Sequence, residues 1–302
     1  MTVAARACYP RFAVPTASDL GVDRRARGTH EGAVERFYAR GVHGRTDIHR
    51  GYLNFGYWED GNDDYVSAAE TLVRRIGTLA GLAAGSRLLD VGCGHGTQDI
   101  QLYREFGPLE VDALDVTRQH VESGRRQARA HGVEDAVRFH HGSATDLPFE
   151  PETFTHCIGI EGPVHFLTRR RFFEDAARVL RPGGVLALAD YLLTRSPATA
   201  LERTIFRAGC ALWHVPRENV YGPEEYRRHL EDAGFRAVAI EHVGARTFPG
   251  YYREQQRPAF RREMVRLQGV LLGRLGHIVN VAAYKAYELG LCDYVLVRAE
   301  RA

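Results

Sequence analysis

The feature that most constrains this chain is a short apolar run that ends in an acid and then breaks into three glycines at alternate positions. Residues 88–96 read Leu-Leu-Asp-Val-Gly-Cys-Gly-His-Gly, which places the glycines at Gly92, Gly94 and Gly96. A short apolar run bounded by turn residues predicts a buried strand, and glycine lets the backbone approach a ligand where a side chain would clash. We therefore expect a strand at 87–91, a ligand-binding turn, and a helix that begins near residue 96 or 97.

A second acid follows at the distance typical of a nucleoside site. Asp115 ends the apolar segment 111–115, and an acid about 20 residues beyond the glycine turn of a βαβ unit accepts hydrogen bonds from ribose hydroxyls. An acid at the end of a strand is often structural. We interpret Asp115 as a ribose ligand because it follows the glycine turn at this distance. The dinucleotide fingerprint is Gly-x-Gly-x-x-Gly, and the spacing Gly-x-Gly-x-Gly found here disfavours nicotinamide cofactors.

The series of motifs resembles that of S-adenosylmethionine (SAM) dependent methyltransferases of the Rossmann-like class. Asp90 and the three glycines resemble the first motif of this family, and Ala-Arg-Val-Leu-Arg-Pro-Gly-Gly at 177–184 resembles its turn from a helix into a buried strand. The resemblance implies an α/β fold in which a seven-stranded sheet carries helices on both faces and its last strand is antiparallel. It further implies SAM as cofactor and a small-molecule acceptor, as in tocopherol, sterol and bacterial natural-product methyltransferases.

The resemblance also assigns parts of the cofactor site. Residues 142–149 resemble the loop beside adenine, with Ser143 where relatives usually place an acid; a serine hydroxyl can also accept a hydrogen bond. Residues 56–58 resemble an element that closes over the methionine end of the cofactor, although the aromatic cluster at 52–58 could equally pack a small core. The expected cofactor-binding residues are Asp90, Gly92, Gly94, Gly96, Asp115, Val116, Ser143, Ala144, Ile160 and Tyr57.

Two residues after the predicted strand at 154–160 are candidates for catalysis. In this fold the end of that strand abuts the sulfonium, so Glu161 and His165 would lie near the transferred methyl group. An oxygen or nitrogen acceptor would need one of them as a base, whereas a carbon acceptor would pass through a carbocation that a carboxylate and aromatic walls stabilise. The Glu-x-x-x-His spacing resembles sterol-type C-methyltransferases and slightly favours an isoprenoid or aromatic carbon acceptor. The alternatives are O- or N-methylation, or a solvated loop acid beside a core or helix-capping histidine.

The chain divides by composition and periodicity into five segments. Residues 1–30 mix proline, glycine and arginine, which indicates either a flexible tail or an arm that orders over the active site or against another subunit of a homo-oligomer. Residues 243–290 exceed the length of a connection and suggest a helical lid over an apolar or aromatic acceptor, or plain core packing. The remaining segments are a helical cap with the aromatic cluster (31–80), the SAM-binding core (81–242) and the last strand (291–302).

Three local expectations complete the scheme. A helix over 172–180 should end at the Arg-Pro-Gly-Gly turn before a strand at 185–189. Asp190 and Tyr191 follow that strand and are expected to face the ligand crevice. Residues 196–221 show no sustained period and are expected to be irregular.

Composition excludes several classes of function. With 302 residues, 44% of them hydrophobic, the chain can bury a full core, and its nearly balanced net charge of +2 would not attract nucleic acid or anionic lipid. Five cysteines without a Cys-x-x-Cys predict neither a disulfide framework nor a zinc site and fit a reducing cytoplasm. No stretch approaches the ~18 apolar residues of a membrane helix. An RNA methyltransferase and a non-catalytic SAM-fold binding protein remain as alternatives.

Overall fold

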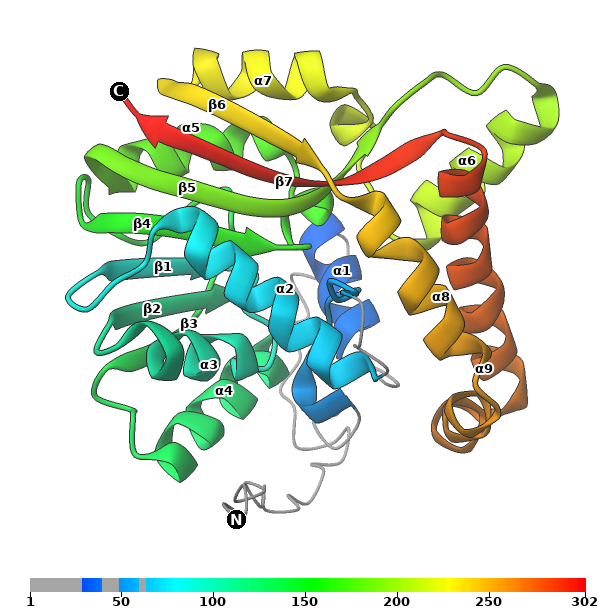
Figure 1. Ribbon diagram of the computed structural model, residues 1–302, viewed down its shortest axis with the longest axis horizontal. Coiled ribbons are helices and arrows are strands. Elements are labelled where there is room, and N and C mark those ends of the chain that lie inside the picture. Colours follow the sequence, from blue (N-terminus) through cyan, green and yellow to red (C-terminus); the bar gives the residue numbers. More distant parts are fainter. Residues whose placement is uncertain (1–28, 40–48, 60–63) are drawn as a thin grey trace.

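A seven-stranded sheet forms the centre of the molecule (Figure 1). The computed structural model describes residues 29–39, 49–59 and 64–302. The strand order is β3-β2-β1-β4-β5-β7-β6, and β7 runs antiparallel to both β5 and β6. This topology confirms the expected sheet with an antiparallel last strand. The strands are β1 (Arg87–Val91), β2 (Glu110–Asp115), β3 (Val137–His141), β4 (Phe154–Ile160), β5 (Leu180–Leu193), β6 (Phe235–His242) and β7 (Cys292–Arg301).

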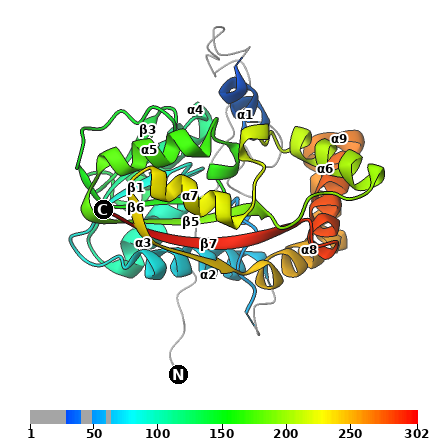
Figure 2. The ribbon, with the colours of Figure 1, turned by 90° about the horizontal axis from the view of Figure 1, so that it is seen from above.

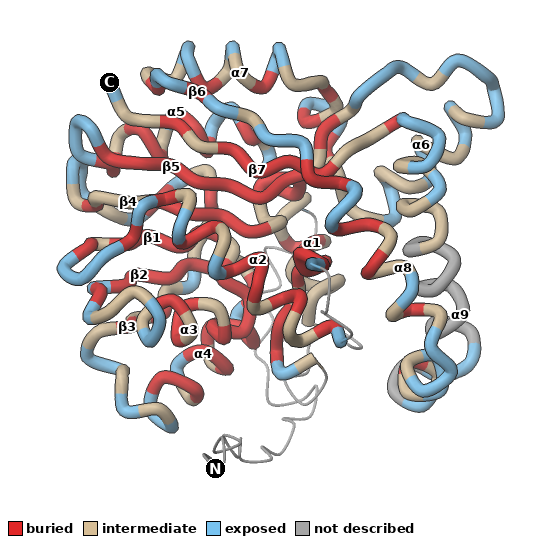
Figure 3. The backbone as a smooth tube through the Cα atoms, viewed as in Figure 1, coloured by how far each residue is buried: buried red, intermediate tan, exposed pale blue. Residues whose placement is uncertain are grey.

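The central strands are apolar because both faces of the sheet are covered. Strand β1 pairs in parallel with β2 on one side and β4 on the other. Leu88 and Leu89 are fully buried, yet they belong to two different hydrophobic clusters. Successive side chains of a strand point to opposite faces, so each leucine supplies the core on its own side. Figure 3 shows that the buried backbone follows the sheet.

Helices cover both faces, as expected. Helices α2 (Tyr65–Ala80), α3 (Thr97–Phe106) and α4 (Arg118–His131) share one hydrophobic cluster with the sheet, and α5 (Arg169–Val179) and α7 (Pro223–Asp232) share the other. Figure 2 shows α2 and α3 on the opposite side of the sheet from α5 and α7. Helix α2 buries apolar residues at helical spacing, among them Leu72 and Ile76, and it ends before Gly81, whose φ of +76° is the left-handed conformation that glycine tolerates.

Four further helices lie near the carboxyl ends of the parallel strands (Figure 1). They are α1 (His30–Tyr38), α6 (Ala200–Leu212), α8 (Phe248–Gln256) and α9 (Pro258–Glu288). Helices α8 and α9 occupy the segment expected to form a helical lid, and α9 departs from helical geometry at Gly269. Residues 1–28 of the expected arm lie outside the described residues, so its role in assembly stays a prediction. No helix in the described part of the chain is long and apolar enough to cross a membrane.

The Arg-Pro-Gly-Gly segment is part of strand β5 and is not a separate turn between α5 and that strand. Helix α5 ends at Val179, and β5 already begins at Leu180, earlier than the expected residue 185. Phe154 pairs with Leu180 while His156 pairs with Val185, so the register shifts across these residues. The turn is therefore accommodated as an irregularity within the pairing of β4 with β5.

Residues 196–221 are not irregular throughout, because they contain α6. Thr199 and Glu202 form a reciprocal capping box at its start: the Thr199 side chain accepts from the Glu202 N–H, and Glu202 accepts from the Thr199 N–H. None of the residues of α6 is buried. Leu201, Ile205 and Leu212 nevertheless recur at helical spacing on one face of α6, so the expectation of an irregular segment was wrong.

Asp190 does not face the crevice, contrary to expectation. It is fully buried on the α5 side of the sheet, where the Arg169 guanidinium Nε lies 2.8 Å from Oδ2 and the Tyr226 hydroxyl donates to Oδ2 at 3.1 Å. Tyr191 points to the other face and reaches the cavity. Adjacent residues in a strand alternate between faces, so only one of the two could have reached the crevice.

Candidate active site

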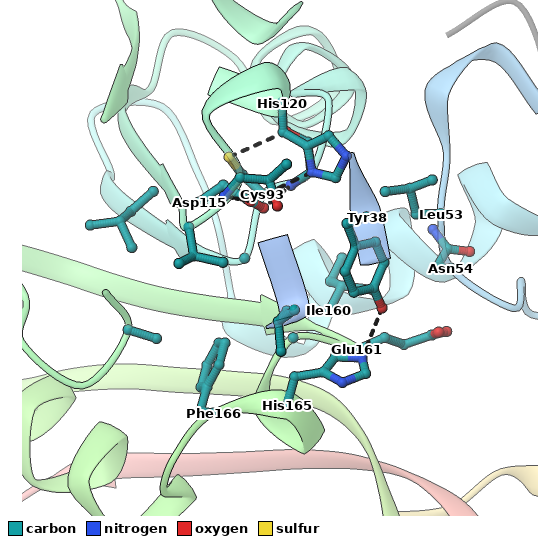
Figure 4. A pocket seen from close by; sticks show the side chains of 18 of the residues that line it. Tyr38, Leu53, Asn54, Cys93, Asp115, His120, Ile160, Glu161, His165 and Phe166 are labelled. Atoms are coloured by element: carbon teal, nitrogen blue, oxygen red, sulfur yellow. Dashed lines mark hydrogen bonds and ion pairs between the residues drawn. The ribbon is translucent and has the colours of Figure 1, made fainter. Parts of the chain in front are cut away.

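An open cavity with an empty volume of about 1150 Å³ lies at the carboxyl ends of β1, β2 and β4. Figure 4 shows the side chains that surround it, which come from the sheet edge, from α1 and from residues 51–55. The sheet topology thus brings most of the predicted site residues to one place. Those in the lining are Gly92, Gly94, Asp115, Val116, Ala144, Ile160, Glu161 and His165.

The glycine turn exposes its backbone to this cavity. Gly92 and Gly94 adopt φ values of +85° and +57°, a region that side-chain-bearing residues rarely enter. A Cβ on Gly94 would lie 3.2 Å from Cδ1 of Leu53, which comes from the opposite wall. Leu53 thus packs closely against the turn, and a side chain at position 94 would crowd this part of the cavity lining.

Asp115 is held as an anion beside this turn. Its carboxylate accepts from the Gly94 N–H at 2.9 Å and the Thr117 N–H at 2.7 Å, and His120 Nδ1 lies 3.5 Å away. Burial alone would raise the pKa of Asp115, but the His120 charge and the hydrogen bonds outweigh burial and lower it. An ionised carboxylate in the lining can accept hydrogen bonds from the two hydroxyls of a ribose.

Asp90 and Gly96 lie beneath the cavity rather than in its lining. Asp90 is fully buried and accepts from Gln98 Nε2 at 2.6 Å, so Gln98 stands between it and the cavity. Burial raises the pKa of Asp90 to about 7, and burial next to Asp90 also raises the pKa of Asp99 well above its usual range. A Cβ on Gly96 would lie 2.4 Å from Phe139, which makes this glycine a requirement of packing at the start of α3. Neither residue takes the direct binding position expected of it.

Tyr57 and Ser143 are likewise outside the lining. The guanidinium of Arg75 covers the Tyr57 ring at 4.2 Å from its centroid, and the aromatic cluster reaches the cavity through Tyr52 and Phe55 instead. The expected contact of Tyr57 with the cofactor therefore stays a prediction, and in this structure Tyr57 does not line the cavity. The Ser143 hydroxyl donates to the Glu31 carboxylate and accepts from the Thr145 N–H.

Glu161 is half-buried directly after β4 and is surrounded by donors. Its carboxylate accepts from the Tyr191 hydroxyl at 2.5 Å, the Tyr294 hydroxyl at 2.8 Å and the Phe55 N–H at 2.6 Å. Burial raises its pKa to about 7, although these hydrogen bonds favour the charged form. Glu161 also has a φ of +59°, an uncommon conformation for a residue with a side chain. It is therefore not a solvated loop acid, and it changes charge near neutral pH.

His165 forms a pair with a residue that the sequence did not single out. The Tyr38 hydroxyl lies 2.8 Å from His165 Nε2, and Figure 4 shows the two side chains meeting at the cavity. Burial lowers the pKa of His165 to about 3, so the imidazole is neutral at neutral pH. Tyr38 comes from α1, and its place in an apolar helical period gave no sign that its hydroxyl reaches a histidine far along the chain.

A second, mainly apolar chamber adjoins the cavity and has an empty volume of about 710 Å³. Helices α6, α8 and α9 contribute to its walls. Four residues line both spaces and therefore lie at the boundary between them, where a passage would run: Phe55, His165, Tyr191 and Trp213. The two spaces thus adjoin beside His165, on the side where β4 ends.

The donors and acceptors of the cavity fit the chemical groups of SAM. Asp115 offers acceptors for ribose hydroxyls, the Gly92 and Gly94 backbone leaves space for an extended ligand, and the loop at 142–145 offers a wall beside the ribose position. Tyr191 and Tyr251 present aromatic rings that suit a sulfonium cation. No group of three or more histidines, cysteines or acids suited to a metal ion occurs among residues 29–39, 49–59 and 64–302.

Comparison with known proteins identifies the family. Residues 88–184 match the family model described as a methyltransferase domain. The chain is 36% identical to erythromycin 3''-O-methyltransferase of Saccharopolyspora erythraea over 196 residues, which cover 64% of each chain. It is 32% identical to 27-O-demethylrifamycin SV methyltransferase of Amycolatopsis mediterranei over 256 residues, which cover 82% of this chain and 89% of that one.

The fold is also that of solved methyltransferases. Geranyl diphosphate C-methyltransferase from Streptomyces coelicolor A3(2), solved with Mg²⁺, a substrate analogue and S-adenosyl-L-homocysteine, superposes with a TM-score of 0.72. The match covers 91% of this chain and 99% of that one at 19% identity, so it supports the fold alone. The sequence relatives, the fold and the cavity agree, and the chain belongs to the SAM-dependent small-molecule methyltransferases of the Rossmann-like class.

Proposed function

We propose that this methyltransferase transfers a methyl group from SAM to a hydroxyl oxygen of a small, largely apolar secondary metabolite. The observation that carries the proposal is the neutral His165, hydrogen-bonded to Tyr38 at the boundary between the cofactor cavity and the apolar chamber. The two sequence relatives described above are named for methyl transfer to oxygen, which supports the same acceptor atom.

The apolar chamber is the proposed acceptor site. Its walls include Ile205, Phe206 and Val215, and its polar atoms are few. Ligand pockets of this kind bind through apolar contact and orient the ligand through a small number of polar groups. A molecule in the chamber would present one hydroxyl through the passage toward His165 and Glu161.

His165 and Tyr38 would receive the proton that the acceptor loses. When bound, SAM supplies the methyl group; a lone pair of the acceptor oxygen forms the new C–O bond, and the electrons of the S–C bond stay on sulfur. The oxygen becomes strongly acidic as this bond forms, so even an imidazole with a lowered pKa takes its proton. The Tyr38 hydroxyl fixes the ring through Nε2, and the rest of catalysis is alignment.

Methylation at carbon is the second candidate, and Glu161 is the observation that favours it. A carboxylate among aromatic rings suits a carbocation intermediate, and Phe55, Tyr191 and Tyr251 line the cavity near Glu161. The spacing of Glu161 and His165 favours this route in the sequence. We rank it second because the two sequence relatives described above are named for methyl transfer to oxygen. The Tyr38–His165 pair does not separate the two routes, since the carbocation formed by methylation at carbon must also lose a proton.

The first test identifies the acceptor and the atom. Full-length protein is incubated with SAM carrying a deuterated methyl group and a metabolite extract of the producing organism, and mass spectrometry finds the compound that gains the label. Fragmentation and NMR then locate the deuterated methyl group. A label on oxygen is expected. A label on carbon would replace the proposal with the second candidate, and transfer to RNA or no transfer at all would contradict both.

The second test measures the role of the pair once an acceptor is known. His165→Ala should lower kcat by roughly 10² to 10⁴, the range for loss of a general base, while the affinity for S-adenosylhomocysteine stays unchanged. Tyr38→Phe should lower kcat by roughly two- to tenfold, as expected for one neutral hydrogen bond. His242→Ala is the matched control, because His242 on β6 pairs with Asp293 on β7, outside the cavity lining. Full activity of His165→Ala would exclude the histidine as the base.

A further inference from the structure

Helix α1 brings a third carboxylate to the cavity, apart from Asp115 and Glu161. Glu31 lies in the first turn of α1 and lines the cavity together with the loop that follows β3. We propose that Glu31 accepts a hydrogen bond from the exocyclic amino group of the adenine of SAM, and that Ser143 holds Glu31 in place for this contact. The proposal concerns cofactor recognition alone, so it is independent of the acceptor atom proposed above.

The order of the strands determines where the adenine base of a bound nucleoside would lie. Strand β3 is the next strand outward from β2, and the Gly142 N–H donates to the Asp115 carbonyl at 3.2 Å. The loop at 142–145 therefore begins directly beside Asp115. A nucleoside whose ribose binds Asp115 in the crevice at the strand ends places its base against this loop, where Ala144 and Thr145 also line the cavity.

The Ser143 hydroxyl already makes hydrogen bonds to Glu31 and Thr145. It donates to Oε1 of Glu31 and accepts from the Thr145 N–H at 3.1 Å, and the Ser143 side chain is outside the cavity lining. A hydroxyl has a single donor hydrogen, and here that hydrogen is used on Glu31. Within the described ranges, no hydrogen bond uses the second carboxylate oxygen of Glu31. That oxygen is left to receive a donor from the cavity.

The donors of the adenine ring decide which side chain can recognise it. The exocyclic amino group of adenine only donates, and a carboxylate only accepts and makes strong, charge-assisted hydrogen bonds. Hypoxanthine carries a carbonyl oxygen at the same position, and this oxygen would face the carboxylate as a second acceptor. A site built to bind a donor rejects an analogue that lacks the donor, because its own polar group is then left unpaired. Glu31 would therefore select adenine.

The same helix links this contact to the proposed catalytic pair. Glu31, Val34 and Tyr38 all line the cavity, and their spacing places them on one face of α1. His30 Nε2 also lies 2.7 Å from the His165 carbonyl oxygen. Binding of adenine at one end of α1 would therefore favour the position of Tyr38 on His165 at the other end.

The experiment compares two nucleosides that differ at one group. Full-length protein is titrated by calorimetry with S-adenosylhomocysteine and with S-inosylhomocysteine, in which the amino group is replaced by a carbonyl oxygen. The unchanged protein should bind the adenosine compound at least tenfold more tightly. Glu31→Gln should weaken that binding about tenfold and abolish the preference, because a glutamine amide offers both a donor and an acceptor.

Two control variants separate recognition from folding. Glu35→Gln changes a glutamate one turn further along α1, which accepts from the Arg118 N–H at 3.4 Å outside the cavity lining; it should keep the wild-type ratio of affinities. Ser143→Ala should lower the preference for adenosine less than Glu31→Gln does. An unchanged ratio in Glu31→Gln, or an equal loss for both nucleosides, would overturn the proposal. Thermal unfolding establishes that each variant is folded.

Discussion

Two carboxylates, the buried Asp115 and the half-buried Glu161, face the same cavity from the two strands that flank β1, and their charges differ. Asp115 ends β2 and Glu161 follows β4. Backbone N–H groups and His120 surround Asp115 and lower its pKa despite burial. The donors to Glu161 are two tyrosine hydroxyls and one N–H, which offset burial only in part, so its pKa rises to about 7. Burial alone therefore does not decide the charge of an acid at this edge; the kind of its partners does, because His120 acts on Asp115, whereas no cation among the described residues acts on Glu161.

The difference suits two tasks in one site. A permanently ionised Asp115 is a fixed acceptor for a neutral ribose, and its position depends on the glycine turn that supplies one of its donors. Glu161 lies near the proposed position of the SAM sulfonium, which loses its positive charge when the methyl group is transferred. It can take up or release a proton near neutral pH. Variants of Gly94, Asp115 and Glu161 test whether the turn and Asp115 bind the cofactor while Glu161 changes its charge.

The largest effect on cofactor binding is expected from Gly94→Val. The φ of +57° is strained for any β-branched residue, and the new side chain would extend from a Cβ only 3.2 Å from Leu53 into the cavity. Calorimetry should detect no binding of S-adenosylhomocysteine, while circular dichroism shows a folded protein. Retained binding would mean that the turn is not part of the cofactor site.

Gly132→Val is the matched control for that variant. Gly132 also has a positive φ, +65°, but a Cβ there would meet nothing within 4 Å. The substitution thus introduces comparable backbone strain at the end of α4, away from the cavity lining. It should lower stability and leave the affinity for S-adenosylhomocysteine unchanged, so that a loss of affinity in Gly94→Val is attributable to the cavity.

A smaller loss is expected from Asp115→Asn, which keeps the shape of the side chain and removes its charge. The affinity for S-adenosylhomocysteine should fall at least about tenfold, since hydrogen bonds to a charged group contribute roughly 1.5–3 kcal/mol. Asp112→Asn on the same strand is the control: Asp112 binds Arg138 and His140 outside the cavity, so the affinity should stay constant. Equal affinities for wild type and Asp115→Asn would remove Asp115 from the ribose site.

The core of the fold could be predicted because its signals are local. The glycine turn, the apolar strands and the helical period of 66–79 each depend on neighbours in the sequence, and β1 and β4 have the bounds that the sequence predicts. Helix α6 was missed although its apolar residues recur at helical spacing. Its apolar side faces the chamber shared with α8 and α9, and that arrangement depends on contacts between distant segments. The early start of β5 depends on pairing with β4 across a register shift, which no local pattern encodes.

The cavity could be predicted only in the parts that the sheet supplies. Asp115, Glu161 and His165 follow strands, so the topology of the sheet determines where they meet. Tyr38 and Glu31 reach the cavity because α1 folds back over the sheet edge, and that arrangement depends on contacts between residues far apart in the chain. In the aromatic segment, the sequence indicated the right stretch, but the choice among its rings depends on which face Arg75 covers.

The least effect on cofactor binding is expected from Glu161→Gln, whose influence should appear in the pH dependence of stability. Burial raises the pKa of Glu161 from 4.5 to about 7, so the folded state holds the proton more tightly than the unfolded state. The stability that this acid contributes is complete below pH 4.5 and is lost as the pH rises through about 7. Each pKa unit corresponds to about 1.4 kcal/mol, and the loss cannot exceed roughly 3 kcal/mol.

Urea unfolding at pH 5 and pH 8 isolates this contribution. Glutamine does not titrate, so the unfolding free energy of wild type relative to Glu161→Gln should fall by roughly 1–3 kcal/mol between the two pH values. Asp90 and Asp99, whose pKa values are also raised, occur in both proteins and cancel in the difference. Glu134→Gln, at an exposed loop position, should show no such change. A pH-independent difference for Glu161→Gln would mean that Glu161 stays ionised like Asp115, and the contrast between the two acids would then be lost.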